Sequence, residues 1–171
     1  MIRENGGKRL LSMVGLMVVV CLIPMLAWGQ SYPSLSDAPQ VERAGAGDVA
    51  VIVAVENYDH LPPVRGAVAN ANDWETYFRR GLGMRQVHVI VNEQATDVEI
   101  LQQARLAAEG VGEGGRLWFV FMGHGVSNQD GTDGLLVGAD ARNNPTSLYS
   151  RSVAQQDLLN LLDEGKQAET V

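Results

Sequence analysis

Cysteine is almost absent from this chain, whose 171 residues include a single one, Cys21. No disulfide framework can form within the chain, so its folded part has to rest on packing alone. Cys21 lies in an apolar N-terminal run, where we interpret it as an apolar filler. A lipid attachment at Cys21 is disfavoured, because Val20 stands where a small residue would normally precede a lipidated cysteine.

Basic residues are also scarce, since 13 Lys and Arg stand against 20 Asp and Glu, which gives a net charge of −7 at pH 7. Nucleic acids and anionic membranes attract positively charged proteins, so the acidic balance argues against both as partners. A phosphate-binding loop is not supported either. Gly112, Gly114 and Gly115 precede an expected strand rather than a helix, and no Lys followed by Ser or Thr comes after them.

Charged residues are missing from residues 10–28, a run that follows Arg3, Lys8 and Arg9. Residues 27–29 (Ala-Trp-Gly) then supply a small-x-small cleavage pattern, so residues 1–29 are predicted to be an export signal. The expected location is periplasmic or secreted. The alternative is an uncleaved membrane anchor, because the run exceeds the usual signal core, although Pro24 argues against a continuous span. A membrane would then be contacted only through this segment.

Residues 30–47 are rich in Ser, Pro, Gly and Ala, which predicts a flexible linker. Residues 48–171 are expected to form one domain. Apolar runs and helical spacing alternate along it as strand, helix, strand, helix, strand, long loop, helix and the start of a strand. This order predicts an α/β fold with a mostly parallel sheet and helices on both faces. The expected strands are 48–55, 87–91, 117–122 and the start at 169–171, and the expected helices are 67–80, 96–111 and 152–165.

Capping signals support two of these helices. Thr96 and Glu99 match a capping box, in which each side chain satisfies a free backbone N–H of the other residue. A weaker signal of the same kind predicts that the last helix begins at Ser152. The stretch 126–151 is long for a loop in a compact domain, so we expect it to be functional or to contain a small hairpin.

The strand 117–122 runs directly into Gly123, His124 and Gly125. Ligands and chemistry gather at the carboxyl ends of strands in such sheets, so His124 is a candidate general base. The alternative is a histidine that only bonds backbone at the strand end. His60 lies in a polar loop and His88 within a short strand, and both are interpreted as structural or solvated, without metal-ligand spacing.

From Val49 to Val171 the sequence resembles the large-subunit half of caspase-like cysteine peptidases, including the bacterial metacaspase-type members. Residues 49–74 (VAVIVAVENYDHLPPVRGAVANANDW) resemble the opening strand, substrate loop and first helix of that family, and residues 119–125 (FVFMGHG) resemble its histidine strand. The resemblance implies a three-layer α/β/α sandwich. It makes His124 the general base and acid of a Cys–His dyad, and Gly125 the donor of an oxyanion-binding backbone N–H, where glycine would permit close substrate approach and unusual dihedrals.

The nucleophilic cysteine of that dyad is absent. Caspases place it about 50 residues after the histidine, which falls just past Val171. The expected function is therefore an exported cysteine-type endopeptidase acting on proteins or peptides, present here as an inactive fragment truncated before the cysteine-bearing strand end. The alternative is a non-catalytic caspase-like module that binds a protein. A flavodoxin-like or receiver domain shares the alternation but gives no reason for Gly-His-Gly or for export.

The resemblance also bears on specificity and cofactors. Arg65 is a candidate for the pocket that binds an acidic residue before the cut, whereas metacaspase-type relatives use acidic groups to bind Arg or Lys, and a solvated surface arginine is the alternative. No cofactor is expected. Calcium is an open alternative through Asp130, Asp133 and Asp140, although their spacing does not match an EF-hand and polar turns explain them as well.

Overall fold

The computed structural model describes residues 35–37 and 45–171, which lie in one compact unit, Pro33–Val171. The expected export signal and most of the expected linker lie outside the described residues. Within the described part of the chain, no helix is long and apolar enough to cross a membrane. The helices are α1 (Ala67–Thr76), α2 (Asp97–Gly110), α3 (Pro145–Ser150) and α4 (Gln155–Leu162), with short helical segments η2 (Leu35–Asp37), η3 (Tyr77–Gly81, a π-helix) and η4 (Asn92–Gln94). The strands are β1 (Val49–Ala54), β2 (Gln86–Val91), β3 (Arg116–Met122), β4 (Gly125–Ser127), β5 (Gly134–Val137), β6 (Ser152–Ala154) and β7 (Glu169–Thr170).

The main sheet is parallel and has the order β2-β1-β3-β7, which confirms the expected α/β class. β1 lies between β2 and β3, and all six of its residues are buried, as a continuous β-branched run predicts. β3 pairs with β1 from Leu117 to Met122. β7 pairs with β3 only at Arg116 and Leu117, so the outer edge of β3 is covered by a strand at its beginning and not at its end.

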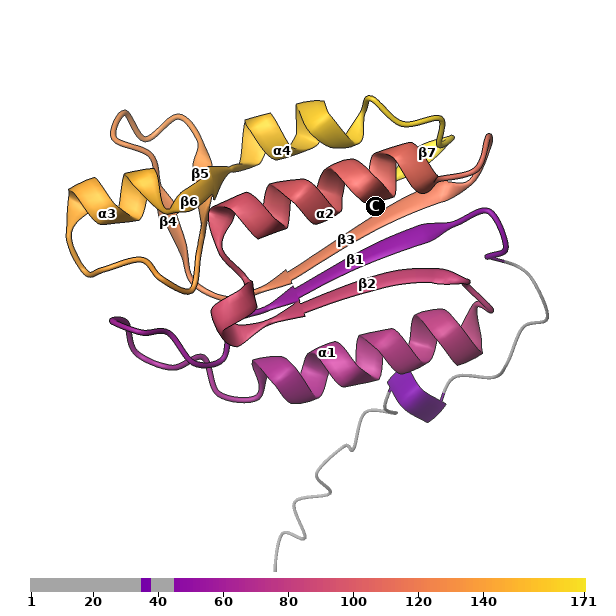
Figure 1. Cartoon of the computed structure of the whole chain (residues 1–171), viewed down its shortest axis with the longest axis horizontal. Coiled ribbons are helices and arrows are strands. Elements are labelled where there is room, and N and C mark those ends of the chain that lie inside the picture. Colours follow the sequence, from indigo (N-terminus) through magenta and orange to yellow (C-terminus); the bar gives the residue numbers. More distant parts are fainter. Residues whose placement is uncertain (1–34, 38–44) are drawn as a thin grey trace, which may run out of the picture. The chain divides into compact units, whose positions relative to one another are not determined.

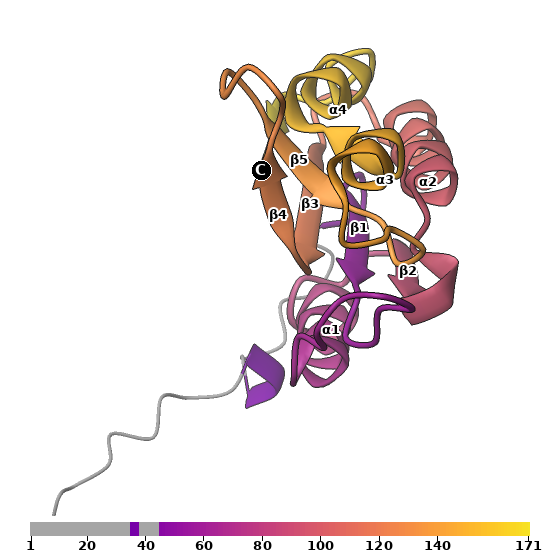
Figure 2. The same cartoon turned by 90° about the vertical axis from the view of Figure 1, so that its left-hand side faces the viewer.

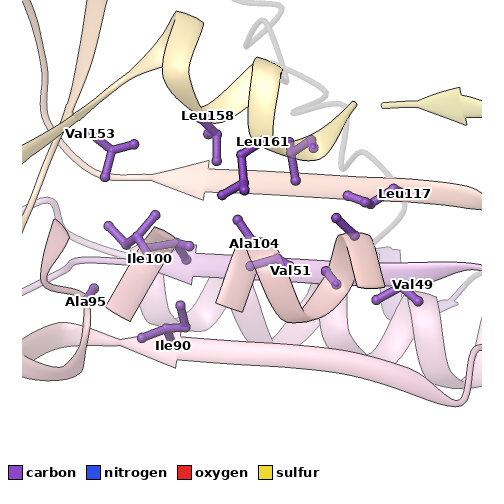
Figure 3. Packing of buried hydrophobic residues seen from close by; sticks show 14 of the residues in the cluster. Val49, Val51, Ile90, Ala95, Ile100, Ala104, Leu117, Val153, Leu158 and Leu161 are labelled. Carbon is purple, nitrogen blue, oxygen red and sulfur yellow. The ribbon is translucent and has the colours of Figure 1, made fainter. Parts of the chain in front are cut away.

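Helices cover both faces of this sheet, as the alternation predicts (Figures 1 and 2). α1 packs on one face, in a cluster that contains Ala71 and Phe78. α2 and α4 pack on the other, where Ile100, Ala104 and Leu161 meet alternate residues of the strands (Figure 3). The result is a three-layer sandwich whose two cores are separated by the sheet.

The start of the sheet is fixed by an ion pair between buried Asp48 and partly exposed Arg116. The Asp48 side chain is only 6% exposed, and its carboxylate accepts from the backbone N–H, Nε and Nη2 of Arg116 at 2.9, 3.0 and 2.9 Å. Contacts of the domain begin slightly before residue 48, its expected first residue, because the N–H of Gly45 donates to the carbonyl of Leu82. Both contacts tie the entry of β1 to neighbouring elements.

The long stretch after β3 contains a second sheet, which is antiparallel and has the order β4-β5-β6. The expected hairpin is therefore present as β4 and β5. The expected start of the last helix at Ser152 was wrong, and an additional short helix is present. Residues 152–154 form β6 and α4 begins at Gln155, while α3 follows Asn144, whose Oδ1 accepts from the N–H of Ser147 with Pro145 in the first helical turn.

The capping box at the start of α2 is half confirmed. Thr96 Oγ1 accepts from the N–H of Glu99 at 3.3 Å, as expected. The reciprocal bond does not form, because the N–H of Thr96 donates to the carbonyl of Gln94 and Glu99 Oε1 accepts from Gln103 Nε2. One side chain therefore caps this helix rather than two.

Candidate functional site

His124 lies two residues beyond the carboxyl end of β3, where the sequence placed a candidate base. Its Nε2 is 2.8 Å from the carbonyl oxygen of Pro62, in the loop between β1 and α1. A carbonyl oxygen can only accept, so Nε2 carries the proton, and the neutral ring then has its lone pair on Nδ1. The fold thus holds the imidazole in the tautomer that a base acting through Nδ1 requires.

Tyr58 fixes the backbone of the same turn. Its hydroxyl accepts from the N–H of His124 at 2.7 Å and donates to the carbonyl of Val137 at 3.2 Å. The two ring centroids are 4.8 Å apart, so the phenol also packs against the imidazole. Burial raises the pKa of Tyr58 above its ordinary 10.0, with the bond from His124 acting in the opposite direction. The hydroxyl therefore stays protonated near neutral pH and links the turn at His124 to β5.

This bridge replaces one bond of the antiparallel ladder. The N–H of Val137 donates to the carbonyl of His124, but the return bond from His124 passes through the Tyr58 hydroxyl. Hydrogen-bonded and non-hydrogen-bonded pairs alternate in such ladders. The next pair, Gly125 with Leu136, is therefore non-hydrogen-bonded, and the N–H of Gly125 points away from β5. It remains available to a ligand.

In Gly123-His124-Gly125, the two glycines differ in the space around them. A Cβ on Gly123 would lie 2.6 Å from the Tyr58 hydroxyl, so packing alone excludes a side chain there. A Cβ on Gly125 would meet nothing closer than 3.7 Å. Gly125 also lies in a strand and outside the left-handed region, so its backbone does not use the dihedrals that only glycine adopts easily. Because Gly125 has no side chain, the space beside its backbone stays open.

His124 and Gly125 form part of the wall of a cavity of about 160 Å³. Pro62, which orients the imidazole, also lines it. Sequence reasoning missed Tyr58 and Pro62 as parts of the site. A backbone carbonyl has no signature in the sequence, whereas Tyr58 could have been suspected from its place just after β1, at the same sheet edge as His124.

None of the remaining candidates lines the cavity beside His124. Arg65 is exposed in the loop before Gly66 and does not line this cavity. His60 is exposed and forms an isolated bridge with Arg142. His88 lies on β2, and its Nδ1 is 2.8 Å from Oε1 of Gln103. That these two histidines are structural or solvated stays a prediction.

The three candidate calcium ligands also have separate partners. Asp133 accepts from the N–H of Gly134 and of Gln156, and Asp140 pairs with Arg151 at 3.2 Å. Asp130 is exposed. Within residues 35–37 and 45–171, no three His, Cys, Asp or Glu side chains are grouped so as to hold a metal ion. The structure therefore does not bring the carboxylates of Asp130, Asp133 and Asp140 together.

Comparison with known proteins agrees with this geometry. A family model described as a caspase domain matches residues 48–166. The structure is similar to the crystal structure of protein GSU0716 from Geobacter sulfurreducens, with a TM-score of 0.58 at 18% identity. The match covers 71% of this chain and 47% of that one, so the chain spans about half the length of this structure, and the likeness concerns the fold alone. No curated protein matches. On the family match, over most of its described length, the chain belongs to the caspase-domain family.

Proposed function

We propose that this chain supplies the histidine half of an exported, caspase-like cysteine endopeptidase. His124 is the base and acid, and the thiolate comes from a polypeptide segment other than residues 22–171, which contain no cysteine. The observation that supports it most is the orientation of His124, whose Nε2 is held by the Pro62 carbonyl and whose Nδ1 is thereby left with the lone pair. Family membership supports protease chemistry in general, and the N-terminal sequence supports export.

The chemistry follows from these groups. A thiolate attacks the scissile carbonyl carbon, and the oxygen that becomes negative is stabilised by the N–H of Gly125. The C–N bond then breaks as the imidazolium gives its Nδ1 proton to the leaving amine, which leaves a thioester. In the second half, His124 takes a proton from water as the water attacks the thioester, and the proton returns to the sulfur as the acid product leaves. No cofactor enters either half.

The pairing of β7 indicates where the thiolate would stand. Thr170 lies opposite Leu117, and Val171 continues the ladder by accepting from Phe119 and donating to Leu117. In this register the paired residues differ by 53 positions, so a strand continuing from Val171 would place a residue numbered about 177 opposite His124. A thiol there would be beside the imidazole.

The test is to read the gene beyond codon 171 and to assay the complete product on peptides. We expect a cysteine at the end of the next apolar strand. His124→Ala should reduce kcat/KM by at least about 100-fold, the scale of a lost general base. His88→Gln, which changes a histidine on β2, should leave kcat/KM unchanged. A stop codon at this point, or equal activity in His124→Ala, would sink the peptidase hypothesis.

The same assay measures the preference for the substrate residue that precedes the scissile bond. If Arg65 binds an acidic residue, peptides cut after aspartate should be preferred to those cut after arginine, and Arg65→Ala should remove that preference. If Arg65→Ala instead leaves the rates on both peptides unchanged from those of the native chain, Arg65 is a solvated surface residue. Calcium can be varied in the same experiment, and the dispersed Asp133 and Asp140 lead us to expect no requirement from these residues.

A second function is favoured by one observation, the uncovered edge of β3. Phe121 lies beyond Phe119, whose N–H donates to the carbonyl of Val171, and both phenylalanines line, with α4, an apolar groove of about 330 Å³. Such an edge can accept a strand from another protein, as in a non-catalytic binding module. The gene sequence separates the two functions, since a cysteine-bearing continuation would fill the edge and a stop codon would leave it open.

A further inference from the structure

We infer that the cavity beside His124 is a subsite for an uncharged aliphatic side chain, carried by the substrate residue that follows the scissile bond. This inference rests on the proposed function and deepens it. The cavity is separate from the Arg65 question, since Arg65 does not line it. Four segments of the chain meet there, and each brings an apolar group.

Apart from His124, the wall of the cavity has no ionisable side chain. Its apolar part comes from the loop after β1, from β4 and β5 and from α3. Asn143 is its one polar side chain besides His124. Burying a charged side chain against such walls without a partner would cost far more than burying an alkyl group would gain. The apolar residues are Leu61, Pro62, Val126, Val137 and Leu148.

The size of the cavity fits one side chain. Its volume is about 160 Å³, below the range of roughly 300–1,000 Å³ typical of sites that enclose a whole small molecule. With about 30 Å³ per water, it has room for about five waters. A branched four-carbon side chain would displace them and leave the peptide backbone outside, over the open face of Gly125.

The chemistry of His124 assigns the side of the cut. Its protonated ring must reach the nitrogen of the leaving amine, so the residue that owns this nitrogen lies against the imidazole. The imidazole forms part of the cavity wall. The residue before the cut instead projects from the carbonyl that the thiolate attacks. The cavity therefore holds the side chain of the leaving residue.

Dipeptide amides with a free amino group copy the leaving product and can be tested on the full chain without any nucleophile. Leucyl-glycinamide, glycyl-glycinamide, aspartyl-glycinamide and lysyl-glycinamide are titrated against the ¹⁵N-labelled chain by NMR. We expect the leucyl compound to shift the resonances of Val126 and Leu148 and to bind at least about tenfold more tightly than the glycyl one, as burial of an aliphatic side chain requires. The charged compounds should bind no better than the glycyl one.

Two variants and a control sharpen the test. Leu148→Trp should fill the cavity and abolish the leucyl preference, while Leu148→Ala should shift the preference toward phenylalanyl-glycinamide. Leu106→Ala changes an exposed leucine of α2 and should alter neither the binding of leucyl-glycinamide nor that of phenylalanyl-glycinamide. Equal binding of leucyl and aspartyl compounds, or an unchanged preference in Leu148→Trp, overturns the inference. If the preference is present but the complete product does not cleave peptides, the proposed function fails and the subsite stands.

Discussion

Single residues set the reactive geometry of this chain, and the sequence shows only some of them. Gly123-His124-Gly125 after an apolar strand predicted the position of the candidate base. The groups that hold it were not predicted, because the Pro62 carbonyl is backbone and the Tyr58 hydroxyl acts across 66 positions of the chain. Neither contact has a local sequence pattern. The sequence thus indicates a histidine at the sheet edge but not which of its nitrogens is free.

The Tyr58 hydroxyl provides a residue-scale test. Tyr58→Phe keeps the ring and leaves the His124 N–H and the Val137 carbonyl without their shared partner, so we expect a loss of about 1–3 kcal/mol in the free energy of unfolding. Urea denaturation measures it, and Tyr149→Phe, at an exposed tyrosine of α3, is the control. An unchanged stability would mean that water replaces the hydroxyl without cost.

The same residue predicts a pH dependence. Burial raises the pKa of Tyr58 in the folded chain above 10.0, its ordinary value in the unfolded chain. The folded state then holds this proton more tightly, so its contribution is complete below pH 10 and is lost as pH rises through the folded pKa. The stability difference between the native chain and Tyr58→Phe should therefore shrink above pH 10. A difference that grows there would contradict the assigned direction.

At the scale of elements, signals that act within one helix turn were predictable and longer-range ones were not. Thr96 caps α2 as its sequence indicates. The expected start at Ser152 was wrong because that residue pairs in β6, and α4 begins at Gln155 without a side-chain cap of its own. Its second N–H is satisfied by Asp133, 23 positions earlier. No pattern around Gln155 could have shown this acceptor.

Asp133 is therefore expected to stabilise α4 from outside the helix. Its Oδ2 accepts from the N–H of Gln156 at 3.2 Å, and its charge lies at the positive end of the helix dipole. Asp133→Ala should lower the free energy of unfolding by about 0.5–2 kcal/mol, the range for a lost helix cap. Urea denaturation beside Asp130→Ala, at an exposed aspartate three positions away, isolates the cap from the loss of charge. Equal effects of the two changes would assign the stabilisation to charge alone.

For the molecule as a whole, the alternation of strands and helices predicted the layers correctly. Each apolar run is long enough for its spacing to identify it as a strand or a helix. Strand order and edge coverage depend on pairing between distant segments, which periodicity does not encode. Among residues 45–171, β1 is paired on both sides, while the outer edge of β3 is paired only as far as Phe119, whose N–H donates to Val171. Its apolar groove includes Leu158 and Leu159 of α4. An open edge with apolar walls favours pairing with another chain.

This edge predicts self-association of residues 30–171. Sedimentation velocity should show a sedimentation coefficient that rises with protein concentration, because a second copy can cover the apolar wall of β3 and α4. Leu159→Lys places a charge in the groove, at a residue 39% exposed, and should reduce this rise. Leu106→Lys adds the same charge at a leucine of α2 that is 43% exposed and does not line the groove, and it should have no such effect. A single monomeric species that unfolds cooperatively at all concentrations would show that the edge is protected without a partner.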